Sequence, residues 1–201
     1  KKAFGVMVQY FVSCLLDAYF SRLIRKDRND DYFGPSINKI FKRLSQTKES
    51  LVGGTVWSSD LVEDLNTLVE LTHNSIDDGE DCEACRRSKH PATTEVNLSE
   101  FRIDTDLYAS SLKSRIRFFK KSTFISYGVG RYCFKRIVAY HIMHHYKYHM
   151  IQCLNDRVKI IQSEHVDYSQ KQIVDKIDLE DVPKLYSGYK HLLDIGNSFL
   201  K

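Results

Sequence analysis

Apolar residues recur at helical spacing along most of this sequence, and this pattern restricts the possible fold more than any other feature. In the first stretch, residues 4–19, apolar side chains stand three and four positions apart, as on one face of an α-helix. Further stretches of the same kind lie at 37–44, 61–71, 129–162, 169–177 and 183–200. The sequence therefore predicts a mainly α fold.

Turn and capping signals divide these helices from one another. Gly34, followed by proline, is typical of a helix start, and Ser58 or Ser59 is typical of an N-cap. Residues 92–98 alternate as in a β-strand, and residues 101–103 are the expected hairpin partner. We expect this small β-hairpin to be the only β-structure.

The length and composition of the chain suit one domain over residues 1–201, in one piece or as two tightly joined lobes, because 42% of its residues are apolar. The chain begins with Lys1 rather than with methionine, so we expect it to be part of a longer protein. Its most apolar stretch, residues 3–24, contains Asp17 and Arg22, which argues against a membrane span or a signal peptide.

The cysteines of the chain fall into two groups. Cys14, Cys133 and Cys153 lie within apolar helical patterns, whereas Cys82 and Cys85 stand together in a polar stretch. The total of five is odd, which does not suit a set of disulfides. We therefore expect a reducing compartment, the cytosol or the nucleus.

The Cys82-x-x-Cys85 pair can supply two ligands of a tetrahedral zinc site but not all four. His141 and His145 stand four positions apart on the helix expected over 129–162, so both imidazoles can face one ion. We therefore predict a structural Zn²⁺ bound by these two cysteines and two histidines. The ion would clamp the cysteine knuckle onto the long helix and stabilise the fold.

Other ligands for this site remain open. His90 follows the cysteine pair closely, and Cys133 precedes His141 by two helical turns on a similar face, so either can replace a histidine. His144 and His149 lie on the same expected helix and are further candidates. A reading without metal is also open, in which the thiols of the pair lie at the surface and the histidines face solvent.

Taken together, these motifs resemble the domain of unknown function 4211 family. The resemblance rests on segments that follow the expected order through most of the chain. They are VQYFVSCLL at 8–16, SLVGGTVW at 50–57, CEAC at 82–85 followed by PAT at 91–93, and GRYC at 130–133 leading to YH at 140–141 and HYK at 145–147. The order of these segments is more specific than any one of them.

The resemblance has implications for the site and for the setting of the protein. The family pattern matches the cysteine pair with two helix histidines, which here fall on His141 and His145, and it often has tryptophan where this chain has Tyr146. It implies a domain toward the C-terminus of a large, otherwise disordered protein associated with the nucleus and chromatin. The expected localisation is therefore nuclear. The family implies no known activity.

An enzyme is not expected. A zinc deaminase needs a glutamate beside its metal-binding histidine or cysteine, and residues 141–149 contain no acidic side chain. The sequence also lacks a glycine-rich phosphate loop and a Gly-x-Ser-x-Gly elbow. Asp104 and Asp106 could bind a divalent ion, but an Asp-Thr-Asp sequence after a hairpin is more typical of a turn. Four protein ligands would also close the zinc ion to substrate.

Charge is unevenly distributed in this chain of net charge +4, because residues 107–155 contain no acidic side chain. Within this span, cations alternate with phenylalanines in a stretch that suits contacts to phosphates and bases. The expected nucleic-acid-binding residues are Lys113, Arg115, Arg117, Lys120 and Lys121. We therefore expect a non-catalytic module that contacts DNA through a basic surface.

A second function remains open beside DNA binding. The phenylalanines of the basic stretch can belong to the core, with its cations on the solvated face, or the acidic loop at 77–81 can neutralise these cations within the chain. The chain would then be a protein–protein docking domain of a chromatin or transcription complex. It would present its first helix, or its last helix with Tyr186, Tyr189, Leu192 and Leu193, to a partner. In both readings the expected partners are DNA or chromatin proteins, without a membrane or a small-molecule substrate.

Overall fold

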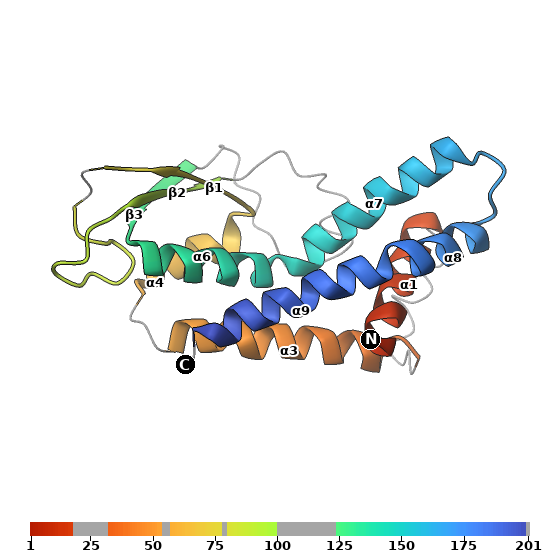
Figure 1. Cartoon of the computed structure of the whole chain (residues 1–201), viewed down its shortest axis with the longest axis horizontal. Helices are drawn as coiled ribbons and strands as arrows, with labels where there is room; N and C mark the ends of the chain where they lie inside the picture. The colour runs from red at the N-terminus through yellow and green to blue at the C-terminus, as the bar shows by residue number, and fades with distance from the viewer. Residues whose placement is uncertain (18–31, 54–56, 78–79, 100–123, 200–201) are drawn as a thin grey trace. The chain divides into compact units, whose positions relative to one another are not determined.

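The computed structural model of the chain describes residues 1–17, 32–53, 57–77, 80–99 and 124–199 (Figure 1). These residues form helices and one small antiparallel sheet, so the predicted mainly α class is confirmed. The helices are α1 (Lys2–Leu16), α3 (Gly34–Gly53), α4 (Ser59–Thr67), α6 (Arg131–His144), α7 (Tyr146–Glu164), α8 (Gln170–Glu180) and α9 (Val182–Ser198). The strands are β1 (Glu70–Ser75), β2 (Thr94–Ser99) and β3 (Phe124–Val129).

The chain divides into two compact units, each built from separate stretches of sequence. The helical unit comprises Lys1–Leu44 and His149–Leu193, and the sheet unit comprises Ser45–Tyr148 and Asp194–Lys201. The chain therefore passes between the units three times, within α3, α7 and α9. None of the helices in the described part combines the length and the apolar character needed to cross a bilayer.

In the helical unit, α1 supplies the central apolar stripe. Its buried residues Phe4, Met7, Val8, Phe11 and Val12 recur at helical spacing, as the sequence predicted. Helix α8 packs on α1 (Figure 1). The spacing of apolar residues in the sequence therefore correctly predicted which face of α1 is buried.

The last helix contributes to the same core. The ring of Phe4 lies 5.5 Å from that of Tyr186 and 5.4 Å from that of Tyr189. Tyr189, Leu192 and Leu193 are buried. These side chains, which the docking reading assigned to a partner, therefore help to form the interior of the helical unit.

Local capping explains where two of the helices begin. The Ser58 hydroxyl accepts a hydrogen bond of 3.3 Å from the Leu61 amide and caps α4, as predicted. Ser169 and Gln172 form a capping box at the start of α8. In both cases the side chain satisfies an amide that has no partner inside its helix.

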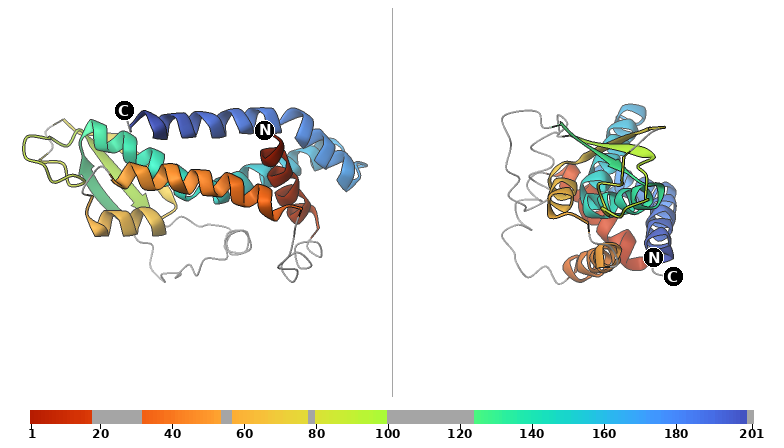
Figure 2. Two further views of the ribbon diagram at one scale, coloured as in Figure 1. Left: turned by 90° about the horizontal axis from the view of Figure 1, so that it is seen from below. Right: turned by 90° about the vertical axis from the view of Figure 1, so that its left-hand side faces the viewer.

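The sheet has the order β1-β2-β3 with antiparallel pairing throughout, so β2 is the central strand. Thr94 pairs with Ser75 on one side and with Val129 on the other. Val96 and Leu98 of β2 are fully buried. Helix α6 runs along one face of the sheet (Figures 1 and 2).

Two features of the β-structure differ from the sequence prediction. The predicted helix over 61–71 ends at Thr67, because Leu68 is extended and Leu71 pairs with Leu98 in the sheet. Strand β3 was not predicted, since its stability comes from pairing with β2 rather than from a local pattern. The expected hairpin partner at 101–103 lies outside the described residues.

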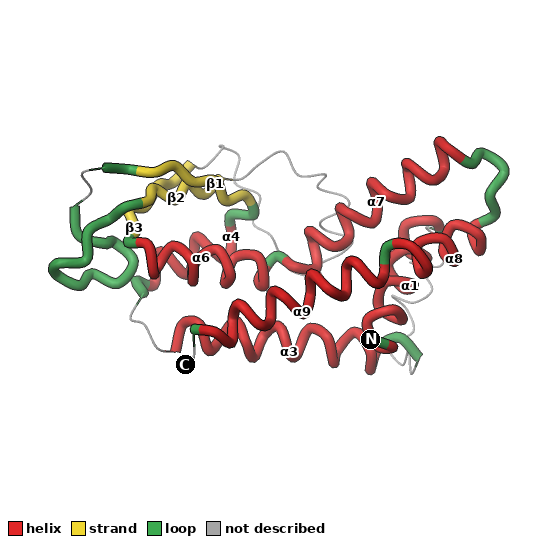
Figure 3. The backbone as a smooth tube through the Cα atoms, in the orientation of Figure 1, coloured by secondary structure: helices red, strands yellow, loops and turns green. Residues whose placement is uncertain are grey.

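The helix predicted over 129–162 is two helices. Val129 belongs to β3, and the helical conformation is interrupted at His145, where ψ is 11° (Figure 3). Helix α6 ends before this residue and α7 begins after it. Apolar spacing continues through the interruption, which is why the sequence pattern did not reveal it.

Gly196 of α9 marks a place in the sheet unit where there is no room for a side chain. A Cβ atom there would collide with Thr47 Cγ2 and lie 2.7 Å from Met143 Cε. We expect Gly196→Ala to lower the free energy of unfolding by about 1–3 kcal/mol, the usual cost of overpacking.

The matched control is Gly188→Ala on the same helix, where a Cβ meets nothing within 4 Å. That variant should be neutral or more stable by up to ~1 kcal/mol. Denaturant unfolding measures both, and an equal effect of the two would contradict the packing described.

Candidate metal centre

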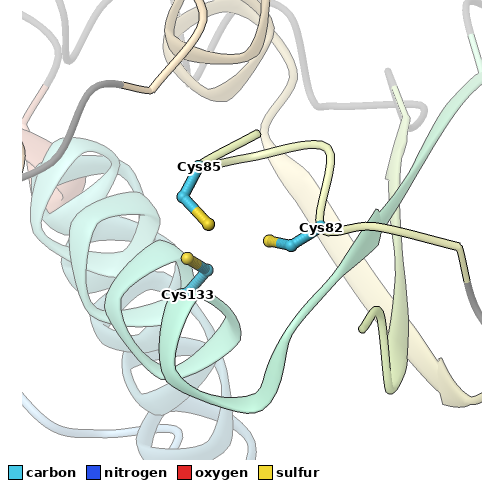
Figure 4. Close-up of side chains that lie close together, drawn as sticks. All are labelled: Cys82, Cys85 and Cys133. Atoms are coloured by element: carbon cyan, nitrogen blue, oxygen red, sulfur yellow. The ribbon is translucent and has the colours of Figure 1, made fainter. Parts of the chain in front are cut away.

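Three cysteines from two distant segments meet in the sheet unit. The sulfur atoms of Cys82, Cys85 and Cys133 all lie within 4.8 Å of one another (Figure 4). Three thiolates around one tetrahedral zinc ion stand about 3.8 Å apart, given a Zn–S bond of about 2.3 Å. The cluster therefore needs only a small adjustment to hold a metal ion.

The loop that carries Cys82 and Cys85 is closed by its own backbone. The Cys82 amide donates to the His90 carbonyl at 2.8 Å, and the Arg86 amide donates to the Cys82 carbonyl at 2.8 Å. Arg86 and Lys89 have positive φ angles, 50° and 66°. These bonds fold the loop back on itself, so that both thiols turn inward (Figure 4).

The loop is also fastened to the edge of the sheet. The Glu83 amide donates to the Gly128 carbonyl at 2.9 Å, and the Gly128 amide donates to the Glu83 carboxylate. Ala84, between the two cysteines, is completely buried. Strand β3 therefore sets the position of the loop.

Strand β3 leads directly into α6, which brings the third cysteine to the loop. Gly130 is the N-cap of α6, and Cys133 lies in its first turn. A Cβ atom at Gly130 would stand 3.2 Å from the Pro91 carbonyl oxygen and 3.8 Å from Cys82 Cβ. The absence of a side chain at Gly130 lets the helix start this close to the cysteine loop.

The surroundings of the cluster favour a thiolate. A hydrogen bond from Cys133, together with bonds from the backbone amides of Gly130, Cys85 and Ala84, lowers the pKa of Cys82 well below its ordinary value despite its burial. The same bond to Cys82 raises the pKa of the Cys133 thiol. Thiolate is the form that binds metal, so Cys82 is prepared for a metal ion before one arrives.

His141 and His145, predicted to complete the site, are not part of this cluster. Their Nε2 atoms lie 2.9 Å from the Leu68 carbonyl and 3.0 Å from the Leu65 carbonyl. A carbonyl oxygen can only accept, so each Nε2 carries a proton and donates it. Both rings are buried against the C-terminal end of α4, where carbonyls lack partners within the helix.

Helix geometry explains why the histidines and the cysteines separate. Cys133 and His141 are eight residues apart in α6, which corresponds to about 12 Å along a helix. One ion cannot bridge that distance. Because Cys133 lies with Cys82 and Cys85, the group that the described residues form is the cysteine alternative rather than the Cys2His2 set.

The remaining histidines considered from the sequence lie in different surroundings. His144 Nδ1 is 3.1 Å from Lys48 Nζ, and His149 is half-buried on α7. His90 is exposed and lines the same pocket as the three cysteines. Of the histidine alternatives, His90 is therefore the one placed beside the cluster.

A pocket of about 880 Å³ opens beside the cysteines in the sheet unit. Its lining includes the three thiols, Gly130 and the aromatic side chains of Tyr132 and Phe199. The cationic side chains of the lining are Arg87, Lys89, Arg131 and Arg136. No acidic side chain from the described residues lines it.

The predicted nucleic-acid-binding residues lie outside the described residues. They are Lys113, Arg115, Arg117, Lys120 and Lys121, within 100–123. The acid-free span reaches into the described part through α6, which contributes Arg131 and Arg136 to the pocket. Sequence reasoning did not single out these two arginines, because on the sequence they resemble ordinary helix cations.

Comparison with known proteins gives one result. A family model described as a domain of unknown function (DUF4211) matches residues 1–102. The matched part contains Cys82 and Cys85 and ends before Cys133. Neither the curated proteins nor the solved structures give a match.

The burial of His144, together with its contact with Lys48, gives stability a dependence on pH. Burial, and then the neighbouring charges of Lys48 and His141, lower the pKa of His144 to about 4. Below pH ~6.5 the unfolded chain takes up a proton at this residue that the folded chain does not. Stability should therefore fall as pH is lowered from about 6.5 toward 4, and His144→Asn should lose less over that range.

Thermal unfolding of both proteins at pH 7 and pH 5, at matched metal content, measures this difference. Since acid also weakens metal binding in both proteins, only the difference between them reports His144. The same loss of unfolding temperature in the two proteins would show that His144 is protonated as easily in the folded chain as in the unfolded one.

Proposed function

Because the chain belongs to the DUF4211 family, whose description assigns no function, we propose a function from its own site. The chain is a zinc-stabilised, non-catalytic module through which a nuclear, chromatin-associated protein contacts DNA. The observation that carries this proposal is the cluster of Cys82, Cys85 and Cys133 beside a pocket whose described lining is cationic and free of acidic side chains.

The cluster favours zinc by its chemistry. Thiolates select zinc among the common divalent ions, and a Cys-x-x-Cys turn with a third cysteine is a frequent zinc-binding set. Backbone amides directed at Cys82 provide the outer hydrogen bonds that metal-bound thiolates need. The fourth ligand in this proposal is His90, which lies on the same pocket.

A structural role follows from where the ligands lie in the sequence. Cys82 and Cys85 belong to the loop between β1 and β2, whereas Cys133 belongs to α6. One ion would join the loop to the helix that covers the sheet, so its binding free energy would add to the stability of the fold.

The charge of the site supports DNA as the ligand. An ion with three thiolates carries one negative charge, which leaves the four cations of the pocket largely uncompensated. The basic stretch at 113–121, which precedes α6 in the sequence, adds five more cations to the charge of this part of the chain. Such a surplus suits a phosphate backbone, which binds through neutralisation of its charges.

A non-catalytic role is part of the proposal. Hydrolytic zinc sites combine an open coordination position with a carboxylate that acts as acid or base. No carboxylate from the described residues lines the pocket. The alternative to DNA contact is a protein–protein docking domain, in which the same cations meet an acidic partner.

The purified chain should contain one zinc ion, and loss of zinc from single variants should show which residues bind it. We expect Cys82→Ser and Cys133→Ser to lose zinc and to unfold at a temperature lower by about 10 °C or more. Loss of the ion should remove several kcal/mol of folding free energy, and each kcal/mol changes the unfolding temperature of a domain of this size by ~2–4 °C. His141→Ala should keep zinc but lose some stability with its hydrogen bond to Leu68.

Elemental analysis of the metal, with thermal unfolding, measures these outcomes. The matched control is Cys153→Ser, an exposed cysteine outside the cluster, which should retain the ion. Zinc retained by Cys133→Ser but lost from His141→Ala would return the site to two cysteines and two histidines.

DNA binding should depend steeply on salt. If the basic stretch contacts phosphates, the logarithm of affinity falls linearly with the logarithm of salt concentration, by ~0.9 for each duplex phosphate neutralised. Arg115→Glu combined with Arg117→Glu should make this slope shallower by the amount that corresponds to about two phosphate contacts. Gel-shift or anisotropy titrations at several salt concentrations measure it.

The same titrations separate the two proposed functions. A folded, zinc-loaded chain that binds neither duplex nor single-stranded DNA at low ionic strength would exclude the DNA proposal. Retention of an acidic chromatin protein in a pull-down at low ionic strength, with release as salt is raised, would then support the docking alternative, because salt screens contacts between exposed charges.

A further inference from the structure

We propose that the pocket beside the cysteine cluster binds a single nucleotide whose base is unpaired, with the phosphate held at the start of α6 and the base packed on Tyr132. The inference rests on the proposed function, since DNA would supply the nucleotide, and it names the site and the part of the ligand that it takes. Its evidence comes from the described residues of the sheet unit and is independent of the basic stretch at 113–121.

The first observation is a buried arginine that has no acidic partner among the described residues. Arg136 is 4% exposed, and its guanidinium donates to the Leu51 carbonyl. Its Nε atom has no hydrogen-bond partner among the described residues. No ion pair in the described part of the chain includes Arg136. A buried cation with an unused donor is costly unless an anion meets it, and Arg136 lines the pocket.

The second observation is the start of α6. Gly130 has no side chain with which to cap this 14-residue helix, so the N-cap residue itself takes none of the first amides of the helix. Helix N-termini attract phosphate through these amides and the helix dipole. Arg131, the first residue of α6, is exposed and lines the same pocket.

The third observation selects a nucleotide among phosphate-bearing ligands. Tyr132 is 56% exposed, and its ring meets that of Phe199 edge-on at 5.7 Å. Exposed aromatic rings beside cations provide the stacking platforms on which single-stranded nucleic acids bind. The guanidinium of Arg136 lies 5.7 Å from the Tyr132 ring centre, so the sites for phosphate and base are adjacent.

The size and polarity of the pocket agree with this ligand. Its volume of about 880 Å³ is within the range of ~300–1,000 Å³ typical of small-ligand sites. Arg87 and Lys89, from the loop that carries Cys82 and Cys85, add two cations to the lining. A base inside a duplex has both faces stacked on its neighbours and has none free for the Tyr132 ring, so the ligand is an unpaired or terminal nucleotide.

The test uses 2′-deoxyadenosine 5′-monophosphate, which fits the pocket without requiring the basic stretch. In the zinc-loaded, ¹⁵N-labelled chain, we expect this nucleotide to shift the amide signals of Gly130, Arg131, Tyr132 and Cys133. Inorganic phosphate should shift the same signals about tenfold more weakly, because it lacks the base, whose stacking contributes ~1–3 kcal/mol.

Variants separate the phosphate contact from the stacking contact. Arg131→Glu should weaken the binding of both probes by about tenfold, as expected for loss of a charge-assisted contact. Tyr132→Ala should weaken nucleotide binding by about fivefold or more and leave phosphate binding unchanged. The matched control is Lys135→Glu, an exposed cation of the same helix outside the pocket lining, which should change neither affinity by more than about twofold.

Several outcomes would overturn the inference. Nucleotide that shifts none of the four signals would exclude the site, and so would equal effects of Arg131→Glu and Lys135→Glu. A phosphoserine peptide that binds as tightly as the nucleotide, with no effect of Tyr132→Ala, would assign the pocket to a phosphoprotein instead.

The failure of this inference can be distinguished from failure of the proposed function. Salt-dependent duplex binding that the Arg115→Glu, Arg117→Glu variant loses, together with no shift of the four amide signals by the nucleotide, would remove the pocket but keep DNA contact. Nucleotide binding in the pocket without any binding to long DNA would keep the pocket but exclude the proposed DNA contact. The pocket would then bind a free nucleotide.

Discussion

The sheet unit depends on helix α6 providing hydrogen-bond donors for the ends of two other helices. The carbonyls in the last turn of any helix have no partner within it. His141 and His145 donate to Leu68 and Leu65 at the end of α4, and Arg136 donates to Leu51 in the last turn of α3. These donors are buried, so an unmade bond would not be replaced by water. Arg136 and His141 of α6, with His145 directly after it, therefore fix where the ends of α3 and α4 lie against this helix.

The cysteine cluster is the continuation of this arrangement at the other end of α6. The first turn of the helix presents Cys133 to the loop, and later turns present the donors to α3 and α4. The same helix thus contributes a cysteine to the cluster from its first turn and nitrogen hydrogen-bond donors from its later turns. The two kinds of residue that sequence reasoning joined in one site have separate tasks, because a helix keeps them far apart.

Sequence reasoning predicted what depends on local periodicity. The stripe of α1, the start of α3 and the Ser58 cap were recoverable, since their signals lie within a few residues. Leu71 was misassigned because its spacing from Leu65 and Leu68 fits a helix, whereas its pairing with Leu98 is a long-range contact. The interruption at His145 was missed for a related reason, as apolar spacing is unchanged across it.

The site was partly predictable on the same grounds. The Cys82 and Cys85 pair carries a local signal of two thiols at a fixed spacing. Cys133 was recognised only as an alternative, because an isolated cysteine in an apolar pattern resembles a core residue. Its neighbour Gly130 was the available clue, since a glycine before a helix often marks a close approach of backbone. Arg136 had no such clue, because burial of an arginine is a property of the fold.

The division of each unit between distant stretches of sequence affects how the chain is made. Gln170, at the start of α8, bonds to the end of α1 across 154 residues. During synthesis, the apolar stripe of α1 emerges from the ribosome before α8 and α9, so the part of it that they cover stays exposed until they follow. Such late, long-range contacts slow folding and expose surfaces that aggregate. The helical unit, although built from helices, is therefore open to aggregation until its last helices have been made.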